Sequence, residues 1–348
     1  MLFIHEATEF PTTARNAVLS IGNFDGVHLG HQRMLSEGQR QARERKLNFV
    51  IMTFDPHPMT VLRPALARPP LMTTAQRLEI LRQYQPDVLW LVKTDPAFLN
   101  ITAEQFMRDI MVQTIGARVI VEGGNFTFGK GAEGTVSTLR DYSQQWGWKT
   151  EIIRTCQAVL LDLSLVDVSS SLVRWLIGHG RVSDARRLLG RYYTWRGRVA
   201  HGAGRGTTLG YPTLNIQSEQ LTPAPGVYAG RAVITGRTFP AAISVGNNPT
   251  FNGTTTTVEA FVLDFSEVAY DQEVEIQFIH WLRDQYKFSS PEALAAQIQR
   301  DVEAIQMGSA PEAPDLEQEP AGAESMSNMA AAVRGDTGVT RLRDQNYP

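Results

Sequence analysis

Residues 17–31 read AVLSIGNFDGVHLGH, an apolar run followed by a glycine-rich segment that carries two histidines. The run AVLSI is typical of a buried β-strand, and residues 31–45 beyond the segment have apolar residues at helical spacing. Glycines let backbone N–H groups approach an oxyanion, and the N-terminus of the following helix presents partial positive charge at the same place. The stretch therefore predicts a phosphate-binding strand, loop and helix, with Gly22, Asn23, Gly26 and Gly30 in the loop.

His28 and His31 are three residues apart, which places them on one face of a helix. Both could donate hydrogen bonds to phosphate oxygens whose negative charge grows in a transition state. Two alternatives remain at this point. The pair could bind a metal, although no third or fourth ligand follows at a recognisable spacing, or both could be ordinary surface histidines.

The first half of the chain alternates short β-rich runs with helical patterns, which favours a parallel sheet with crossover helices on both faces. In such sheets ligands bind at the carboxyl ends of the strands, near the point where strand order reverses. The segment GNFDGVHLGH follows the first expected strand, and TFDPHP (53–58) ends the second. The expected strands are 17–21, 49–54, 88–92, 117–122 and 151–155, and the helical patterns between them cover 31–45, 74–84, 102–115 and 135–146.

From about residue 193 the sequence pattern changes to short β-rich runs separated by glycine, proline and threonine, which indicates an antiparallel barrel or sandwich. One helical pattern follows at 291–305. The segment from 308 onward is rich in Ala, Pro, Glu and Ser and is expected to be a disordered tail. The predicted domains are therefore 1–190, 191–307 and the tail 308–348.

Composition excludes several classes of protein. The formal net charge is −3 and basic residues are scattered, so the chain lacks the basic stripe that nucleic-acid backbones require. Apolar runs stay well short of the ~18 residues of a membrane span, and the first residues lack the pattern of a secretion signal. A single cysteine, Cys156, excludes an internal disulfide framework. We therefore expect a soluble cytoplasmic protein with small-molecule partners, and no nucleic-acid or membrane partner; the sequence does not fix an oligomeric state.

An ordered set of motifs resembles the bacterial bifunctional riboflavin kinase/FMN adenylyltransferases, also called FAD synthetases. HLGH resembles the HxGH signature of nucleotidylyltransferases, and the resemblance covers roughly residues 15–305. It implies a Rossmann-like nucleotidylyltransferase domain followed by a small riboflavin kinase-like β-barrel. It also implies ATP as co-substrate, Mg²⁺ as cofactor, and riboflavin, FMN and FAD as substrates and products. The further matching segments, in chain order, are TFDPHP (53–58), NFTFGKGAEG (125–134), SSSLVR (169–174), HGAGRGTTLGYPTLN (201–215), GVYAG (226–230), SVGNNPTF (244–251), VEAFVLDF (258–265) and LRDQYKF (282–288).

For the first domain, the resemblance implies that FMN is joined to ATP with release of pyrophosphate. His28 and His31 would hold ATP phosphates, and Ser170 and Arg174 would bind the β- and γ-phosphates from a helix start. Asn125 would contact the FMN phosphate or its Mg²⁺, and Phe128 and Pro58 could line the flavin. Asp25 is interpreted as a turn and capping residue only.

For the second domain, the resemblance implies phosphorylation of the riboflavin 5′-hydroxyl, for which a carboxylate base is useful because the alcohol is not ionised at pH 7. That role falls on Glu259. Thr213 and Asn215 supply two hard oxygens on one strand face, suited to Mg²⁺, and Arg283 would contact the flavin. The glycine-rich segment HGAGRG and the glycine of TTLG would wrap the ATP phosphates through Gly202, Gly204, Arg205, Gly206 and Gly210.

Three other functions compete with this one. An aminoacyl-tRNA ligase with an HIGH-type site would usually carry a lysine-bearing KMSKS-type loop, and none is visible. A non-catalytic flavin-binding or regulatory protein would have decayed sites, whereas every proposed polar catalytic residue is present. Another HxGH nucleotidylyltransferase stays an alternative.

Overall fold

The structure is a computed structural model that describes residues 1–201, 211–247, 256–286 and 288–308. Residues Met1–Met307 form one compact unit. The tail predicted from residue 308 lies outside the described residues except for Gly308. The predicted boundary at residue 190 stays a prediction.

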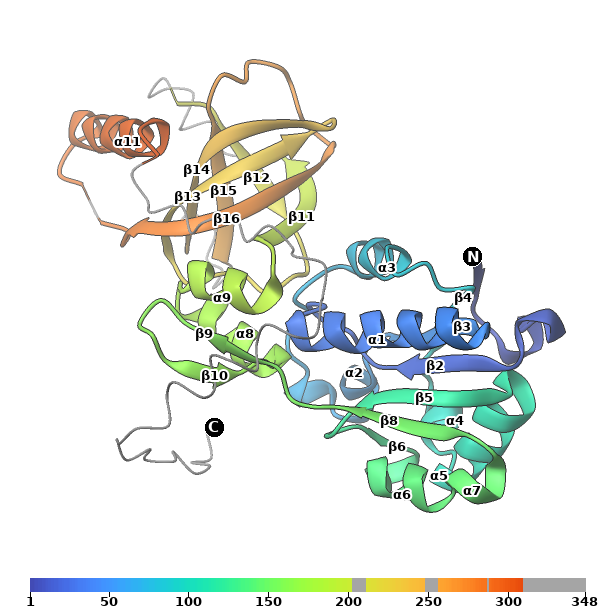
Figure 1. Cartoon of the computed structure of the whole chain (residues 1–348). Helices are drawn as coiled ribbons and strands as arrows, with labels where there is room; N and C mark the ends of the chain where they lie inside the picture. Colours follow the sequence, from blue (N-terminus) through green and yellow to red (C-terminus); the bar gives the residue numbers. More distant parts are fainter. Residues whose placement is uncertain (202–210, 248–255, 287, 309–348) are drawn as a thin grey trace, which may run out of the picture. The chain divides into compact units, whose positions relative to one another are not determined.

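A six-stranded parallel sheet forms the framework of the N-terminal half (Figure 1). The sequence expected all of its strands except the first, a three-residue edge strand, so the predicted parallel sheet is confirmed. In spatial order the strands are β1 (Leu2–Ile4), β4 (Val88–Lys93), β3 (Asn48–Asp55), β2 (Ala17–Ile21), β5 (Ala117–Gly123) and β8 (Lys149–Ile153).

Helices cover both faces of this sheet, because its buried strands present apolar side chains on each side. One face packs against α1 (Leu29–Arg45) and α3 (Thr74–Arg82), and the other against a π-helix (Phe106–Ile115) and α6 (Val136–Asp141). The shorter helices of this half are α2 (Pro58–Leu62), α4 (Pro96–Leu99), α5 (Ala103–Gln105) and α7 (Ser143–Trp146). Short hairpins pair β6 (Thr127–Phe128) with β7 (Gly134–Thr135) and β9 (Gln157–Val159) with β10 (Leu165–Asp167).

The strand order reverses at β2. From β2 the chain moves to β3 and then β4 on one side, and it later returns to β5 on the other side. Parallel sheets bind ligands beyond the carboxyl ends of the strands at such a point. The segment 22–28, which follows β2, and residues 124–126, which follow β5, therefore flank the predicted ligand crevice.

The second half forms a closed antiparallel barrel (Figure 1). Of the alternatives barrel and sandwich, the structure has the barrel. Its strands in spatial order are β11 (Tyr193–Ala200), β12 (Thr213–Gln217), β15 (Thr256–Val262), β14 (Arg237–Asn247), β13 (Gly226–Ile234) and β16 (Glu273–Arg283).

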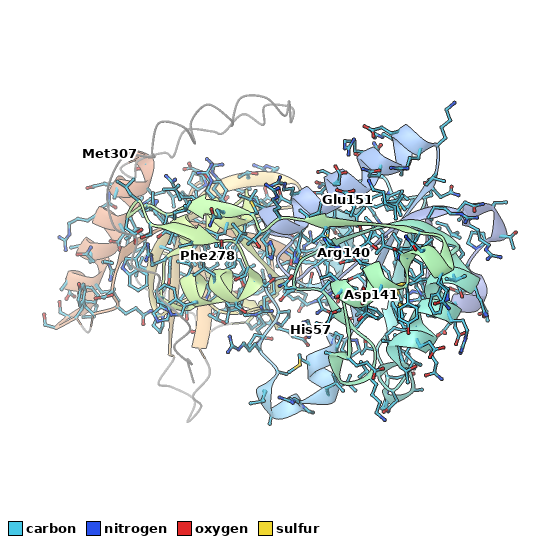
Figure 2. The ribbon with its side chains drawn as sticks, turned by 60° about the horizontal axis from the view of Figure 1, so that its bottom comes forward. His57, Arg140, Asp141, Glu151, Phe278 and Met307 are labelled. Carbon is cyan, nitrogen blue, oxygen red and sulfur yellow. The ribbon has the colours of Figure 1, made fainter. Side chains whose placement is uncertain are left out.

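Alternate residues of the barrel strands point inward to a core that includes Val258, Ala260, Ile243 and Phe278, the last labelled in Figure 2. Residues between them, such as Glu259, point to the outer face. Helix α11 (Pro291–Gln306) packs beside β13 and β14. The helices α8 (Ser170–Gly178) and α9 (Val182–Leu189) share the barrel's hydrophobic core.

Candidate active sites

The loop between β2 and α1 has an unusual backbone. Phe24, Gly26 and Val27 all have positive φ values, of 49°, 82° and 34°. Both apolar residues are fully buried, so their packing holds the loop in this conformation. A Cβ on Gly26 would lie 2.8 Å from Leu71 Cδ1, which leaves no room for a side chain. The loop is thus a rigid, buried turn rather than a mobile one.

The two histidines of the HxGH segment lie together, as the spacing predicts. Their rings stack with centroids 3.7 Å apart, and the backbone N–H of His31 donates to Nδ1 of His28 at 3.3 Å. A Cβ on Gly30 would lie 3.2 Å from the His28 ring, which explains the glycine between the two histidines. Because His28 accepts through Nδ1, its neutral form carries the proton on Nε2 and can donate from there.

Burial and nearby positive charge keep both rings neutral. Burial lowers the pKa of His28 to about 4, and the Arg191 guanidinium contributes in the same direction. Burial, His28 and Arg191 together lower the pKa of His31 well below its ordinary value. The Nδ1 atom of His31 is buried, and no residue in the described part of the chain forms a hydrogen bond with it. The pair therefore offers neutral hydrogen-bond donors and acceptors close to the Arg191 guanidinium.

Ser170 and Arg174 at the start of α8 meet the same loop. The Ser170 hydroxyl donates to the Asp25 carbonyl oxygen at 2.8 Å, and Nη2 of Arg174 forms an ion pair with Oδ2 of Asp25. The Asp25 carboxylate also accepts from the backbone N–H of Leu71, at 3.0 Å and 3.1 Å. The interpretation of Asp25 as a turn residue only is therefore wrong: its carboxylate binds groups that are 46 and 149 residues away in sequence.

Two arginines that the sequence did not single out, the buried Arg77 and the partly buried Arg191, hold the loop by its carbonyl groups. Arg77 donates to the Asn23 carbonyl oxygen at 2.9 Å and to the Phe54 carbonyl oxygen at 2.8 Å, so it joins the ends of β2 and β3. Arg191 donates to the carbonyl oxygens of Gly26 and Val27, at 2.6 Å and 3.1 Å. With its carbonyl groups occupied in this way, the loop is left with N–H groups to offer to an anion.

The predicted flavin residues lie along the same edge of the sheet but in different environments. Asn125 is exposed after β5, whereas Phe128 is only 7% exposed and stacks on Phe126 in the hydrophobic core. Pro58 begins α2, directly after the N-cap residue His57 (Figure 2). The charges of Asp25 and Arg174 both act on the pKa of His57, which burial lowers, so TFDPHP approaches the HxGH loop.

A buried carboxyl group lies where β2 and β5 separate. The backbone pairing of β2 with β5 extends only to Leu19 and Ile120. Beyond it, the Ile21 N–H donates to Oε1 of Glu122 at 2.6 Å, and Glu122 is 1% exposed. Burial raises the pKa of Glu122 well above its ordinary value. The sequence analysis did not identify this residue, because a single Glu at a strand end resembles a solvent-exposed residue.

The proposed kinase residues form a row across the outer face of the barrel. Asn215 on β12, Glu259 on β15 and Ser244 on β14 are directly paired along neighbouring strands. The Thr213 hydroxyl donates to Oε2 of Glu259 at 3.4 Å. The structure therefore brings Thr213, Asn215 and Glu259 together, as the sequence predicts. It adds Gln285, which donates to the Ser244 hydroxyl at 2.9 Å, at the end of this row.

The Arg283 side chain forms hydrogen bonds with other residues of the chain. Its guanidinium donates to both carboxylate oxygens of Asp301 on α11, with Nη2 at 2.8 Å, and Nη1 donates to the Asp284 carbonyl oxygen. The side chain therefore fastens α11 to the end of β16, and its predicted flavin contact stays a prediction. The proposed phosphate-binding residues Gly202, Gly204, Arg205, Gly206 and Gly210 lie outside the described residues.

Comparisons with known proteins cover nearly the whole described chain. A family model described as FAD synthetase matches residues 10–164, and one described as riboflavin kinase matches residues 189–307. A bifunctional riboflavin kinase/FMN adenylyltransferase of Listeria monocytogenes is 32% identical over 301 residues, which is 85% of this chain and 94% of that protein. Those of Haemophilus influenzae and Escherichia coli are 33% and 31% identical, over 83% and 86% of this chain and 93% and 94% of theirs.

Among solved structures, a Streptococcus pneumoniae chain described as a macrolide-efflux protein superposes with a TM-score of 0.77 and 30% identity. The match covers 88% of this chain and 98% of that one. In the part of the chain that the structure describes, every helix is too short or too polar to cross a bilayer. On its sequence and its two domain matches, the chain belongs to the bifunctional riboflavin kinase/FMN adenylyltransferase family.

Proposed function

We propose that this chain phosphorylates riboflavin to FMN with ATP, and then transfers the adenylyl group of a second ATP to FMN to form FAD and pyrophosphate. The observation that carries the proposal is that each of the two family matches covers a different part of the fold, the parallel sheet or the barrel. The FAD synthetase match contains the HxGH loop at the sheet edge, and the riboflavin kinase match contains the Thr213, Asn215 and Glu259 row on the barrel.

In adenylyl transfer, a phosphate oxygen of FMN attacks the α-phosphorus of ATP, and the bond from that phosphorus to the bridging oxygen of pyrophosphate breaks. FMN phosphate is largely ionised near pH 7, so this step requires no general base. Catalysis then consists of positioning and of stabilising negative charge on the triphosphate. His28, through its Nε2–H, and Arg174 would donate to the phosphates, together with the N–H groups at the start of α1.

Several buried polar atoms of this site have no hydrogen-bond partner among the described residues. They are Asn23 Oδ1, His31 Nδ1, Arg77 Nε and Arg174 Nε. A buried polar group without a hydrogen bond costs about 1–3 kcal/mol, so such atoms favour a ligand that satisfies them. Three of the four belong to residues that were assigned to ATP from the sequence, which supports the assignment; the fourth belongs to Arg77, which holds the loop by its carbonyl groups.

In the kinase reaction, the riboflavin 5′-hydroxyl attacks the γ-phosphorus of ATP and loses its proton. Glu259 would accept that proton, because it is the carboxylate at the centre of the polar row on the barrel. The hydrogen bond from Thr213 orients the carboxylate without neutralising it. A positioned base of this kind typically contributes a factor of 10² to 10⁴ to the rate.

The donor set on the barrel suits Mg²⁺. Thr213 and Asn215 offer a hydroxyl and an amide oxygen on one strand, and both are hard ligands of the kind that this ion prefers, while Glu259 on the neighbouring strand stays available as the base. When bound, Mg²⁺ would reduce the negative charge of the ATP phosphates. We further propose that the chain works in the cytoplasm on small molecules alone, without nucleic-acid or membrane partners, as its charge distribution and single cysteine suggest.

The purified full chain, incubated with riboflavin, ATP and Mg²⁺, should yield FMN first and FAD later, as followed by chromatography. FMN and ATP without riboflavin should yield FAD and pyrophosphate. Flavin that stays bound while neither product forms would support the alternative, a flavin-binding or regulatory protein. FAD formation from FMN without any kinase activity would leave only the nucleotidylyltransferase assignment.

A further inference from the structure

We infer that Asp25 is a positioning residue for adenylyl transfer, which holds Arg174 in place for the ATP phosphates; this inference rests on the function proposed above. Asp25 lies in the centre of the loop between β2 and α1 and is only 6% exposed. Its carboxylate binds Arg174 and the Leu71 N–H, and its carbonyl oxygen accepts from Ser170. One loop residue thus contacts both α8 residues that were assigned to phosphate.

Asp25 forms its ion pair with only one nitrogen atom of the Arg174 guanidinium. Nη2 is bound to Asp25, whereas Nε is buried and has no partner among the residues that the structure describes. A guanidinium is a rigid planar fork, so fixing Nη2 also fixes the direction in which the remaining N–H groups point. The ion pair therefore fixes the orientation of the N–H groups that would meet the ATP phosphates.

This arrangement reduces the entropic cost of binding ATP. A free arginine side chain loses rotamer freedom when it is immobilised on a ligand. Asp25 imposes that order before ATP arrives, and the Leu71 N–H fixes the carboxylate in turn. The carboxylate also offsets the charge of a guanidinium whose side chain is only 15% exposed. Pre-organisation of this kind should favour both ATP binding and the transition state.

Asp25→Asn tests the inference, because it keeps the size and an acceptor oxygen but removes the charge. We expect kcat/KM for ATP in FAD formation to fall at least tenfold, while riboflavin phosphorylation by the same preparation stays within about threefold of parental. In an Arg174→Gln background, Asp25→Asn should cost at most a further factor of about two to three, because coupled residues are non-additive.

Asp184 provides a matched control. It is also a buried aspartate that accepts from a backbone N–H, of Leu161 at 2.7 Å, and from an arginine, Arg181 Nε at 2.7 Å, but it lies on α9. Asp184→Asn should leave FAD formation within about threefold of parental. A loss in Asp184→Asn equal to that in Asp25→Asn would attribute the effect to any broken buried ion pair and would overturn the inference.

The remaining outcomes separate the inference from the proposed function. If Arg174→Gln is inactive in FAD formation but Asp25→Asn is unaffected, the inference fails and the role of Arg174 stands. If Arg174→Gln itself has parental activity, both fail. An Asp25→Asn loss that persists undiminished in the Arg174→Gln background would show that Asp25 acts by another route. If Asp25→Asn does not fold, as judged by circular dichroism, Asp25→Ser replaces it in the same comparison.

Discussion

His28 and His31 lie in a site that suppresses their protonation. In the unfolded chain a histidine has a pKa near ~6.5, whereas burial in the folded chain lowers that of His28 to about 4. The folded state therefore resists protonation, and the contribution of His28 to stability is complete above the unfolded pKa and is lost as the pH falls toward 4. Neutral donors suit a site that must bind and then release a highly charged product.

We predict that His28 stays neutral, with its proton on Nε2, from pH 8 down to about 5 in the free protein. Nitrogen-15 chemical shifts of labelled histidines, measured across this pH range, report both the tautomer and the protonation. A His28 signal that titrates between pH 6 and 7 would contradict this description of the site.

Glu122 gives a pH dependence of opposite sign. Burial raises its pKa, so between the unfolded and folded pKa values the folded state binds more protons. Its contribution to stability is thus complete below the unfolded pKa and is lost as the pH rises. Glu122→Gln keeps an acceptor for the Ile21 N–H but cannot ionise. We predict that this substitution raises the free energy of unfolding more at pH 8 than at pH 5.

Urea unfolding of the parental chain and of Glu122→Gln at the two pH values measures this difference directly. The comparison also cancels the contributions of the other titrating groups, which both proteins share. If Glu122→Gln changed the free energy of unfolding equally at pH 5 and pH 8, the Glu122 carboxyl group would not stay protonated in the folded state as its burial implies.

At the level of secondary structure, a largely buried ion pair helps to attach α11 to the barrel. Arg283 and Asp301 have side chains that are 15% and 7% exposed, and the pair connects the end of β16 to the middle of the helix. Removing one partner of a buried ion pair typically costs about 3–5 kcal/mol, because the other charge is left unpaired. We predict that Asp301→Ala lowers stability on this scale and reduces kinase activity, while FAD formation from supplied FMN persists.

The exposed pair Arg237–Glu267 provides the control, since its side chains are 61% and 64% exposed. Exposed ion pairs contribute little, so Glu267→Ala should change neither activity and should barely alter the unfolding transition. Equal effects of the two substitutions would contradict the anchoring role of Asp301.

Hydrophobic pattern was sufficient to predict the long elements. The runs at 17–21, 88–92 and 117–122 match β2, β4 and β5 to within one residue, because each run is apolar and mostly buried. The pattern did not predict β1, β9 or β10, which are three residues long and carry little periodic signal. It also gave no sign that residues 106–115 form a π-helix, since that distinction rests on backbone hydrogen bonds.

The candidate sites were predictable only in part, because the sequence shows local motifs but not contacts between distant residues. His28, His31, Ser170 and Glu259 lie in motifs whose residue types indicate their chemistry. Asp25, Arg77 and Glu122 act through contacts with residues 23 to 149 positions away, and nothing local in the sequence reports such distances. Motifs therefore identified the residues that would touch substrate, and the structure was needed for those that hold them.

For the whole molecule, every proposed functional residue precedes residue 308. We predict that deletion of residues 308–348 leaves both riboflavin phosphorylation and FAD formation within about threefold of parental. Both rates should be measured on one preparation, with circular dichroism as the check of folding. Loss of both activities in a folded, truncated chain would show that the tail takes part in catalysis.

The central claim is that one chain carries two chemically independent sites. His28→Ala should lower FAD formation by a factor of about 100 to 1000, as expected for a lost donor to developing charge, and should spare the kinase step. Glu259→Gln should lower riboflavin phosphorylation by a factor of about 10² to 10⁴ and should spare FAD formation, because the attacking FMN phosphate has no proton to lose.

Mixing these two variants tests the claim most directly. Neither variant alone should convert riboflavin to FAD at an appreciable rate. An equimolar mixture of His28→Ala and Glu259→Gln, given riboflavin, ATP and Mg²⁺, should form FAD, because FMN made by the first chain is used by the second. A mixture that forms no more FAD than the sum of the two variants alone, with both chains folded, would contradict the account.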